Sequence, residues 1–437
     1  MKTQSLFIPV LGLALAGASG LVHAEKAPPP PQAGKAHAAP ADLPPPLSPE
    51  KAVKAGLDYL LSQQHDNGGW GQGGGWRQNV EDQQGRGARV EGDQVKDPPD
   101  LGNTCVSLMA LLRAGHSPVG GGHQEAAQKA FKFICAEVDK ADVDSLFVTS
   151  VRDTQLQSKI GTYVDTFLAA WVLSELKGHV DDKDEPRRAA LLDKVIQKME
   201  RHQEGDGSFA GNQGWAAVLS QGLCSKAFNR AAQNGAKVSQ SALDKDQGQN
   251  IAGVDLQQGF TAAAAAPAPG KPSDAGISIY RESSKLGGLM ENSRTNAIRR
   301  GKAEKVLEQP DAPAEEKAKA KADLEKIAND DAARDAAAKS VLSRLADERY
   351  VAGFGNNGGE EFLSYMNLAE MMHEKGGEDW KKWRESMIQT LTTAQNADGS
   401  WSGHHCITGR TFCTSTALLT LTVERLSAPK AVEVTTN

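Results

Sequence analysis

The sequence has little of several residue types, and each shortage excludes a class of protein. Aromatic residues make up 5% of the chain. Cysteines number five in 437 residues, so the fold does not depend on a disulfide framework. Basic residues do not outnumber acidic ones, and a net charge of −6 argues against a nucleic-acid partner. Beyond the N-terminal segment, no apolar run approaches the roughly 20 residues that span a bilayer, so no transmembrane segment is expected in the mature chain.

The N-terminal segment 1–24 has the pattern of a secretory signal peptide. Lys2 provides the positive charge, residues 6–21 are apolar, and small residues end the segment at Ala24. Residues 25–47 are rich in proline and alanine, a composition that cannot pack a core and predicts an extended linker. We therefore expect an exported protein, periplasmic or extracellular, and an uncleaved signal would make it envelope-associated.

One motif, Gln-x-x-x-Gly-x-aromatic, occurs three times in the chain. The copies begin at Gln64, Gln203 and Gln395 and end at Trp70, Phe209 and Trp401. Each copy follows an amphipathic helix and precedes a polar loop, after which a second helix begins. Such spacing is typical of folds in which each repeat packs on its neighbours.

The predicted helices are of two alternating kinds. Helices before the motifs carry charge on one face, as solvated outer helices do, whereas the helices after them are apolar all round and read as buried inner helices. Period-two runs of β-branched residues are nearly absent, so a substantial sheet is not expected. The predicted inner helices lie within 104–112, 163–173, 215–223, 362–372 and 413–421.

Residues 235–348 interrupt this alternation. Their first part is rich in Ala, Gly, Ser and Pro and predicts a loop, and the second part interleaves Lys with Glu and predicts a helical hairpin over about 292–309 and 313–348. The repeat domain then consists of 48–234 and 349–428, with a tail at 429–437. We expect the insertion to project from the surface, with docking of a partner as the alternative.

The three motifs resemble the QW-type repeats of squalene–hopene cyclases, and the helix-loop-helix units resemble the repeats of protein prenyltransferase β subunits. The resemblance runs from about residue 48 to 426, without the insertion. It implies an all-α fold, an (α/α) toroid of about five to six helix pairs whose inner helices line a cavity. It also implies structural roles for the motif residues Gln64, Trp70, Gln203, Phe209, Gln395 and Trp401.

The catalytic motifs of these families do not occur in the sequence. Protonating terpene cyclases use Asp-x-Asp-Asp, and the nearest segments, at 142–145 and 181–184, do not match it. Prenyltransferases bind zinc through Asp-x-Cys and a later His, and no cysteine here has Asp two positions before it. The thioester motif of complement-like toroids is missing too. The likeness of fold therefore leaves the activity open.

Residues 401–416 hold the densest chemistry in the chain. His404, His405, Cys406 and Cys413 offer imidazole and thiolate groups, the donors that zinc prefers. Their spacing fits no standard zinc site, so three alternatives stand beside a metal site: a Cys406–Cys413 disulfide, a Cys–His nucleophile pair, and a packed loop without chemistry. Zinc is the one cofactor that this set indicates.

Three further residues are candidates for acid chemistry. Glu361 lies in the first turn of a predicted inner helix, where a carboxylate meets the helix dipole favourably, and Tyr365 lies one turn along. Asp165 lies within an apolar segment, where a buried carboxylate needs a partner. Each is a candidate catalytic group if it faces a central cavity, and the helix dipole alone is a sufficient structural explanation for Glu361.

Two classes of function fit these observations. The first is a binding or scaffold toroid whose cavity or insertion takes an apolar small molecule, a glycan or a protein partner. The second is an enzyme, terpene-cyclase-like or other, that acts in the toroid cavity. The missing catalytic motifs and the export signal favour the first. An aromatic-lined central pocket would favour the enzyme, and a filled centre would favour the scaffold.

Overall fold

The computed structural model describes residues 47–77, 88–91, 95, 97–261, 272–355 and 357–426. Contacts divide the chain into the units Met1–Pro45 and Pro46–Asn437, and every described residue belongs to the second unit. The expected signal peptide at 1–24, the linker at 25–47 except its last residue, and the tail at 429–437 lie outside the described residues. Those three assignments therefore stay predictions.

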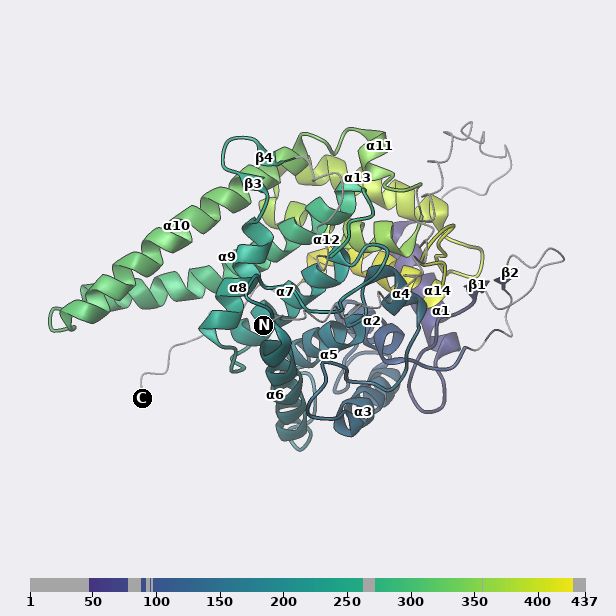
Figure 1. Cartoon of the computed structure of the whole chain (residues 1–437). Coiled ribbons are helices and arrows are strands. Elements are labelled where there is room, and N and C mark those ends of the chain that lie inside the picture. Colours follow the sequence, from purple (N-terminus) through teal and green to yellow (C-terminus); the bar gives the residue numbers. More distant parts are fainter. Residues whose placement is uncertain are drawn as a thin grey trace, which may run out of the picture. The chain divides into compact units, whose positions relative to one another are not determined.

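Helices dominate the described residues, as the sequence predicts. Six of the 14 α-helices form a closed circuit, in which each helix packs on the next and the last packs on the first. Figure 1 shows several of these helices, such as α7 and α12, in the middle of the view. In chain order the circuit consists of α2 (Leu101–Arg113), α5 (Val164–Glu175), α7 (Val218–Gln233), α9 (Ser278–Glu308), α12 (Gly359–Lys375) and α14 (Arg410–Leu421).

A second set of helices packs on this inner circuit. Helix α1 contacts α13 and α14, α3 contacts α2 and α6, α6 contacts α5, α8 contacts α7 and α9, and α13 contacts α12. The predicted alternation of solvated and buried helices thus corresponds to outer and inner positions. The outer helices are α1 (Pro49–Gln63), α3 (Gln124–Lys140), α6 (Glu185–His202), α8 (Gln240–Ile251) and α13 (Gly377–Ala394).

The remaining elements are short connections. Two antiparallel strand pairs occur among the described residues, and neither extends beyond three residues per strand. No described helix has both the length and the apolar character needed to cross a membrane. These connections are α4 (Gln155–Ile160), α11 (Glu348–Val351), the 3-10 helix Val423–Arg425, and strands β1 (Gly75–Arg77), β2 (Ala88–Val90), β3 (Val254–Asp255) and β4 (Gly259–Phe260).

The motif glutamines join neighbouring outer helices by equivalent hydrogen bonds. Nε2 of Gln64, after α1, donates to the Ala126 carbonyl of α3 at 2.9 Å. Nε2 of Gln395, after α13, donates to the Ala52 carbonyl of α1 at 2.9 Å. Gln203, after α6, reaches a carbonyl in the first turn of α8 at 3.3 Å. The third motif therefore ties the last outer helix to the first one, which closes the ring.

The motif aromatics lie in the core beneath these loops. The indole N–H of Trp70 donates to the Leu60 carbonyl at 2.7 Å, and that of Trp401 donates to the Leu391 carbonyl at 2.7 Å, so the two copies have the same geometry. Both indoles are completely buried. Phe209 is also buried but has no N–H to donate. The two tryptophans thus fix the ends of the outer helices that precede them.

Buried ion pairs lie between the inner helices. Glu370 of α12 binds Arg113 of α2 at 2.9 Å and also binds Lys226 of α7, although α7 and α12 are not neighbours in the circuit. Burial alone would raise the pKa of Glu370, but Lys226, Arg113 and Arg230 outweigh that effect and hold the pKa below its usual range. The prediction that inner helices are apolar all round is therefore wrong at these positions, where the charges neutralise one another.

Residues 235–348 differ from the predicted loop and insertion. They include α8, and the first half of α9 packs against α7 and α12 as a member of the inner circuit, with Ile279 and Leu286 buried. Small residues allow this contact: a Cβ on Gly222 of α7 would lie 2.3 Å from the Ser284 hydroxyl. The Gly- and Ser-rich composition that predicted a loop is here the surface of a close helix–helix contact.

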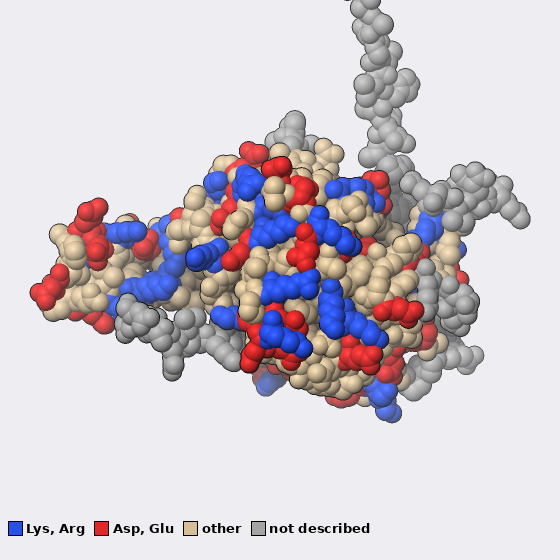
Figure 2. All heavy atoms as spheres, turned by 90° about the horizontal axis from the view of Figure 1, so that it is seen from below, with Lys and Arg blue, Asp and Glu red and all other residues tan. Residues whose placement is uncertain are grey.

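Helix α9 and α10 (Ala314–Leu342) form the predicted hairpin, and their distal ends project together in Figure 1. The first arm begins at 278 and not at 292, and the second ends at 342 and not at 348. Ion pairs such as Arg300–Asp331 at 2.6 Å join the two arms. Figure 2 shows Lys and Arg interleaved with Asp and Glu on one face, including the projecting hairpin.

Candidate functional site

The loop between the third motif and α14 folds onto the N-terminus of α12. The N–H of Gly359 donates to the Ile407 carbonyl at 3.0 Å, and the N–H of Ile407 donates to the Glu360 carboxylate at 3.2 Å. Two clusters that the sequence treats separately, the acidic turn and the His/Cys loop, therefore meet at one end of the inner circuit.

Glu361 is fully buried, and hydrogen bonds fix both of its oxygens. Oε1 accepts from the Tyr280 hydroxyl and from the Phe354 N–H at 2.8 Å. Oε2 accepts from the Gly358 N–H at 3.0 Å and lies 3.5 Å from Nε2 of His405. An acid at the third position of a helix that bonds back to the N-cap is half of a capping box. Glu361 therefore fixes the start of α12 and the orientation of His405.

Glu360 is equally buried but is only partly satisfied. Its Oε2 accepts from the Ile407 N–H, whereas its Oε1 is buried and accepts no hydrogen bond among the described residues. Burial, and then the neighbouring carboxylate of Glu361, raises the pKa of Glu360 to about 8. The Cys406 thiol also hydrogen-bonds to the Glu360 carboxylate, and a buried carboxylate oxygen that is left without a donor costs about 1–3 kcal/mol.

Glu360, His405 and Cys406 together have the arrangement of metal ligands. A carboxylate oxygen, a ring nitrogen and the sulfur lie within 4.8 Å of one another. In a tetrahedral zinc site, with bonds of about 2.0–2.3 Å, donor atoms lie about 3.3–3.8 Å apart. The three side chains therefore need to approach by about 1 Å to hold such an ion, and carboxylate, imidazole and thiolate are all donors that zinc accepts.

The backbone at Cys406 has an uncommon conformation. Its φ of 52° lies in the left-handed region, which residues other than glycine adopt at a cost of roughly 1–3 kcal/mol. Burial, and then Glu360, raises the pKa of the Cys406 thiol to about 12. The loop therefore holds the sulfur beside a carboxylate at an energetic cost, which a cation between the two groups would offset.

A polar pocket of about 720 Å³ opens beside this group, and His405 and Cys406 form part of its wall. Gln155 holds the loop in place, because its Oε1 accepts from the N–H groups of Thr408 at 3.0 Å and Gly409 at 3.2 Å. Gln155 and Thr408 also line the pocket. The donor group therefore has one side fixed by the protein and one side open to a ligand.

Two of the predicted metal ligands lie outside the donor group. His404 is exposed at the wall of the pocket, and Cys413 is buried in α14, where its thiol donates to the Ile407 carbonyl at 3.6 Å. All five cysteines are free thiols, so the Cys406–Cys413 disulfide is not present in the structure. The reason is that the helix directs Cys413 into the core while Cys406 lines the pocket.

Tyr365, predicted beside Glu361 as a catalytic group, braces the fold instead. Its buried hydroxyl donates to the Val351 carbonyl at 3.0 Å, which connects α12 to the short helix α11. Burial, and then Glu361, raises the pKa of the Tyr365 hydroxyl. Nothing in this arrangement directs Tyr365 toward the polar pocket.

Asp165 belongs to a second buried acidic pair, at the starts of α5 and α2. It accepts from Nε2 of Gln157 at 2.6 Å, and burial raises its pKa. Its neighbour is Asp100, the N-cap of α2, whose pKa is raised to about 7 by burial and then by Asp165. The sequence predicts a buried partner for Asp165 but not that the partner is a second acid.

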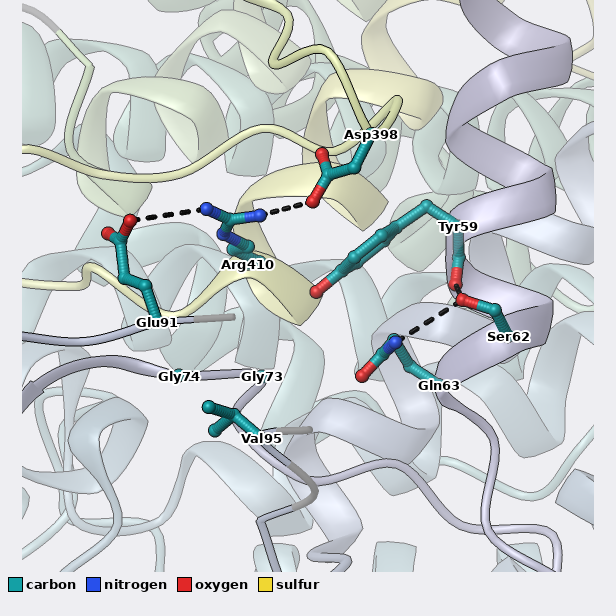
Figure 3. A pocket seen from close by; sticks show the side chains of 9 residues that line it. All are labelled: Tyr59, Ser62, Gln63, Gly73, Gly74, Glu91, Val95, Asp398 and Arg410. Atoms are coloured by element: carbon teal, nitrogen blue, oxygen red, sulfur yellow. Dashed lines mark hydrogen bonds and ion pairs between the residues drawn. The ribbon is translucent and has the colours of Figure 1, made fainter. Parts of the chain in front are cut away.

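A smaller polar pocket of about 260 Å³ lies between α1 and the start of α14 (Figure 3). Arg410 pairs there with Glu91 at 3.3 Å and with Asp398. Tyr59 and Gln63 of α1 line the same pocket. Because one guanidinium engages both carboxylates, the charges in this pocket are already paired within the chain.

The sequence pattern pointed to Glu361 as a candidate and not to Glu360, although both acids lie in the first turn of the same predicted helix. The helix start contained a signal, because the acid of a capping box is the third helical residue, here Glu361. Glu360, the second residue, is therefore not needed for the cap. Lys159 lines the pocket, and its charge acts against the raised pKa of Glu360. No sequence pattern connects the two residues, because Lys159 lies 201 positions earlier in the chain (360 minus 159).

No protein-family model and no curated protein matches this sequence. The structure is similar to solved variants of the type II terpene cyclase MstE from Scytonema. One, in complex with its substrate geranylgeranyl dihydroxybenzoate, matches with a TM-score of 0.45 and 11% identity over 86% of this chain and 97% of that chain. Another, with the product merosterolic acid A, matches with a TM-score of 0.46 and 12% identity over the same shares.

The toroid that the repeats predict is supported within this chain by the closed circuit of inner helices. Because the TM-scores of these matches are below 0.5, no residue role or ligand is transferred from them to this chain. The ring and the donor group described above rest on contacts within this protein.

Proposed function

We propose that this protein is an exported toroid of about five to six helix pairs that binds zinc through Glu360, His405 and Cys406 and takes a polar ligand in the adjoining pocket. The closed inner circuit supports the number of pairs, since each inner helix has an outer partner. By contact, α3 is the outer partner of α2, α6 of α5, α8 of both α7 and α9, α13 of α12, and α1 of α14.

The observation that carries the proposal is the three-donor group, in which ligand atoms of Glu360, His405 and Cys406 lie within 4.8 Å of one another. Zinc sites with three protein ligands keep a fourth position open, and here the pocket supplies that open side. Glu361 adds support, because a carboxylate beside a ligating histidine commonly fixes the orientation of its ring. When bound, zinc would supply a Lewis-acidic position facing the pocket.

A binding role fits the centre of the ring better than an isoprenoid cyclase does. The ion pairs of Glu370 with Arg113 and Lys226 are buried between inner helices, the elements that the family resemblance gives as the lining of an apolar cavity. An apolar chain offers no hydrogen bonds to buried charges, so its binding next to these ion pairs would be unfavourable. The polar pocket at the end of the circuit is therefore the better ligand site.

Metal content tests the proposal. Protein purified without chelator is expected to contain about one zinc per chain by elemental analysis, and Glu360→Gln and His405→Ala are expected to lose it. His404→Ala is the matched control: it removes the adjacent histidine, which lies outside the donor group, and should keep the metal. Zinc below a tenth of stoichiometry in the unaltered protein after incubation with zinc, or loss in His404→Ala alone, would contradict the assignment.

Export remains part of the proposal because of the N-terminal pattern at Lys2 and residues 6–21. Mass spectrometry of the protein from its native host is expected to find a mature N-terminus at Glu25. An intact Met1 in a cytosolic fraction would remove this part of the proposal without affecting the metal site.

A further inference from the structure

We propose that the polar pocket binds a saccharide chain, with the indole rings of Trp76 and Trp215 as its stacking surfaces. This inference names the ligand class of the pocket in the proposed function, and to that extent it rests on that function. It is carried by a different observation, the exposure of these two tryptophans.

The chain has seven tryptophans, and five of them are at most 9% exposed. Trp76 and Trp215 are the exceptions, with 45% and 37% of their surface exposed. A large indole left in water is unfavourable, and exposed aromatic surface that is contiguous with a pocket marks a place that a ligand covers.

Both exposed tryptophans adjoin the wall of the same pocket. Trp76 lines the pocket directly, and its backbone N–H donates to the hydroxyl of Thr408 at 2.8 Å. The backbone N–H of Trp215 donates to the carbonyl of Ser158 at 3.2 Å, and Ser158 is another lining residue. Trp76 therefore lines the pocket, and Trp215 is joined through its backbone to Ser158, one of the lining residues.

Trp215 is also held by its ring. Its centroid lies 5.6 Å from that of Phe354, and Phe354 lies 5.1 Å from the ring of His405. Edge-to-face contacts of this kind fix the orientation of an aromatic ring without burying both of its faces. Trp215 thus presents a fixed apolar surface at the end of an aromatic row that starts in the donor group.

The polar groups between these surfaces suit a ligand rich in hydroxyl groups. Lys159 lines the pocket and forms no ion pair among the described residues, and Asp153 and Gln72 add an acceptor and an amide. A sugar ring has an apolar C–H face and a polar edge, so it can cover an indole and satisfy such groups at once. An isoprenoid chain would cover the indoles but leave the polar groups desolvated without partners.

An array of neutral and acidic glycans, followed by titration calorimetry with the strongest ligand, tests the inference. The unaltered protein is expected to bind at least one glycan, and Trp76→Ala and Trp215→Ala are each expected to weaken that binding about tenfold or more, because each substitution removes one stacking surface. Leu256→Ala is the matched control, because Leu256 is 59% exposed but lies between β3 and β4 and does not line the pocket.

Zinc content and melting temperature, measured on the same samples, separate this inference from the proposed function. Both tryptophan variants should keep the zinc and the melting temperature of the unaltered protein. Glycan binding without zinc would overturn the metal site and leave the saccharide inference standing. A zinc-loaded protein that binds no glycan on the array, or binds one with the same affinity in both tryptophan variants, would overturn the inference and leave the metal site standing.

Discussion

Replacing Trp401 by alanine should destabilise the ring strongly. The indole is fully buried, its N–H donates to the last turn of α13 at 2.7 Å, and a Cβ placed on Gly56 of α1 would lie 2.8 Å from its edge. The substitution leaves a cavity where the last outer helix meets the first and removes the donor to the Leu391 carbonyl. Truncating a buried tryptophan costs about 3–5 kcal/mol, and we expect a loss of unfolding free energy in that range.

Urea unfolding followed by circular dichroism measures this loss. Trp76→Ala provides the control, because the same chemical change at a side chain 45% exposed should alter the unfolding free energy by at most about 0.5 kcal/mol. The reasoning fails if Trp401→Ala unfolds at the same urea concentration as the unaltered protein, or if the two variants lose equal stability.

Three further substitutions test the packing and the buried charges. Gly399→Ala should lower the unfolding free energy in urea by about 2 kcal/mol or more, because the φ of Gly399 is 87° and the added Cβ would lie 2.4 Å from the Ala55 carbonyl oxygen. Gly205→Ala is the control and should cost little, because its added Cβ would have nothing within 4 Å. Equal effects of the two substitutions would refute the close contact. Lys226→Met should cost about 3–5 kcal/mol at pH 7, because it leaves the buried Glu370 with one partner fewer. The depressed pKa of Glu370 gives stability that is present above pH 4.5 and lost as the pH falls, so the difference between the variant and the unaltered protein should shrink at pH 4, and a pH-independent difference would contradict this. Asp100→Asn should stabilise the protein at pH 8 by up to roughly 4 kcal/mol, because the pKa of Asp100 is raised from 3.8 to about 7 and its contribution is present below pH 3.8 and lost as the pH rises through 7. The gain should vanish near pH 4, and a gain that persists there would refute the raised pKa.

Much of the ring could be predicted from local sequence patterns. The motif fixes its own loop, because the glycine needs a positive φ and the glutamine and aromatic act within a few residues or on the adjoining helix end. Gly68 and Gly399 both have φ near 90°, as the turn requires. Helix periodicity then separates outer from inner elements, since burial on one side or on all sides leaves different patterns.

What the sequence could not predict depends on contacts between distant residues. The start of α9 reads as a loop because its small and polar residues can be interpreted only from their contact with α7, 62 positions earlier (284 minus 222 for the facing Ser284 and Gly222). Similarly, Arg113 and Glu370 are unremarkable alone, and their pairing across the ring, 257 positions apart, neutralises both. The sequence therefore predicted apolar inner helices, whereas buried ion pairs lie between them.

The candidate site was half predicted for the same reason. Local chemistry drew attention to His405 and Cys406, and the helix start drew attention to the adjacent acids. That Glu360 and not His404 or Cys413 completes the donor group follows from the bond between Ile407 and Glu360, which spans 47 positions. A helix places Cys413 in the core, and no spacing rule within the loop reveals that.

X-ray absorption at the zinc edge of the zinc-loaded protein tests the metal assignment most directly, because it counts the sulfur atoms bound to the ion. The donor group of Glu360, His405 and Cys406 predicts one sulfur at about 2.3 Å and nitrogen or oxygen donors at about 2.0–2.2 Å, with the sulfur signal lost in Cys406→Ser. A shell with two sulfurs, as Cys406 and Cys413 together would give, or a shell with none would contradict it.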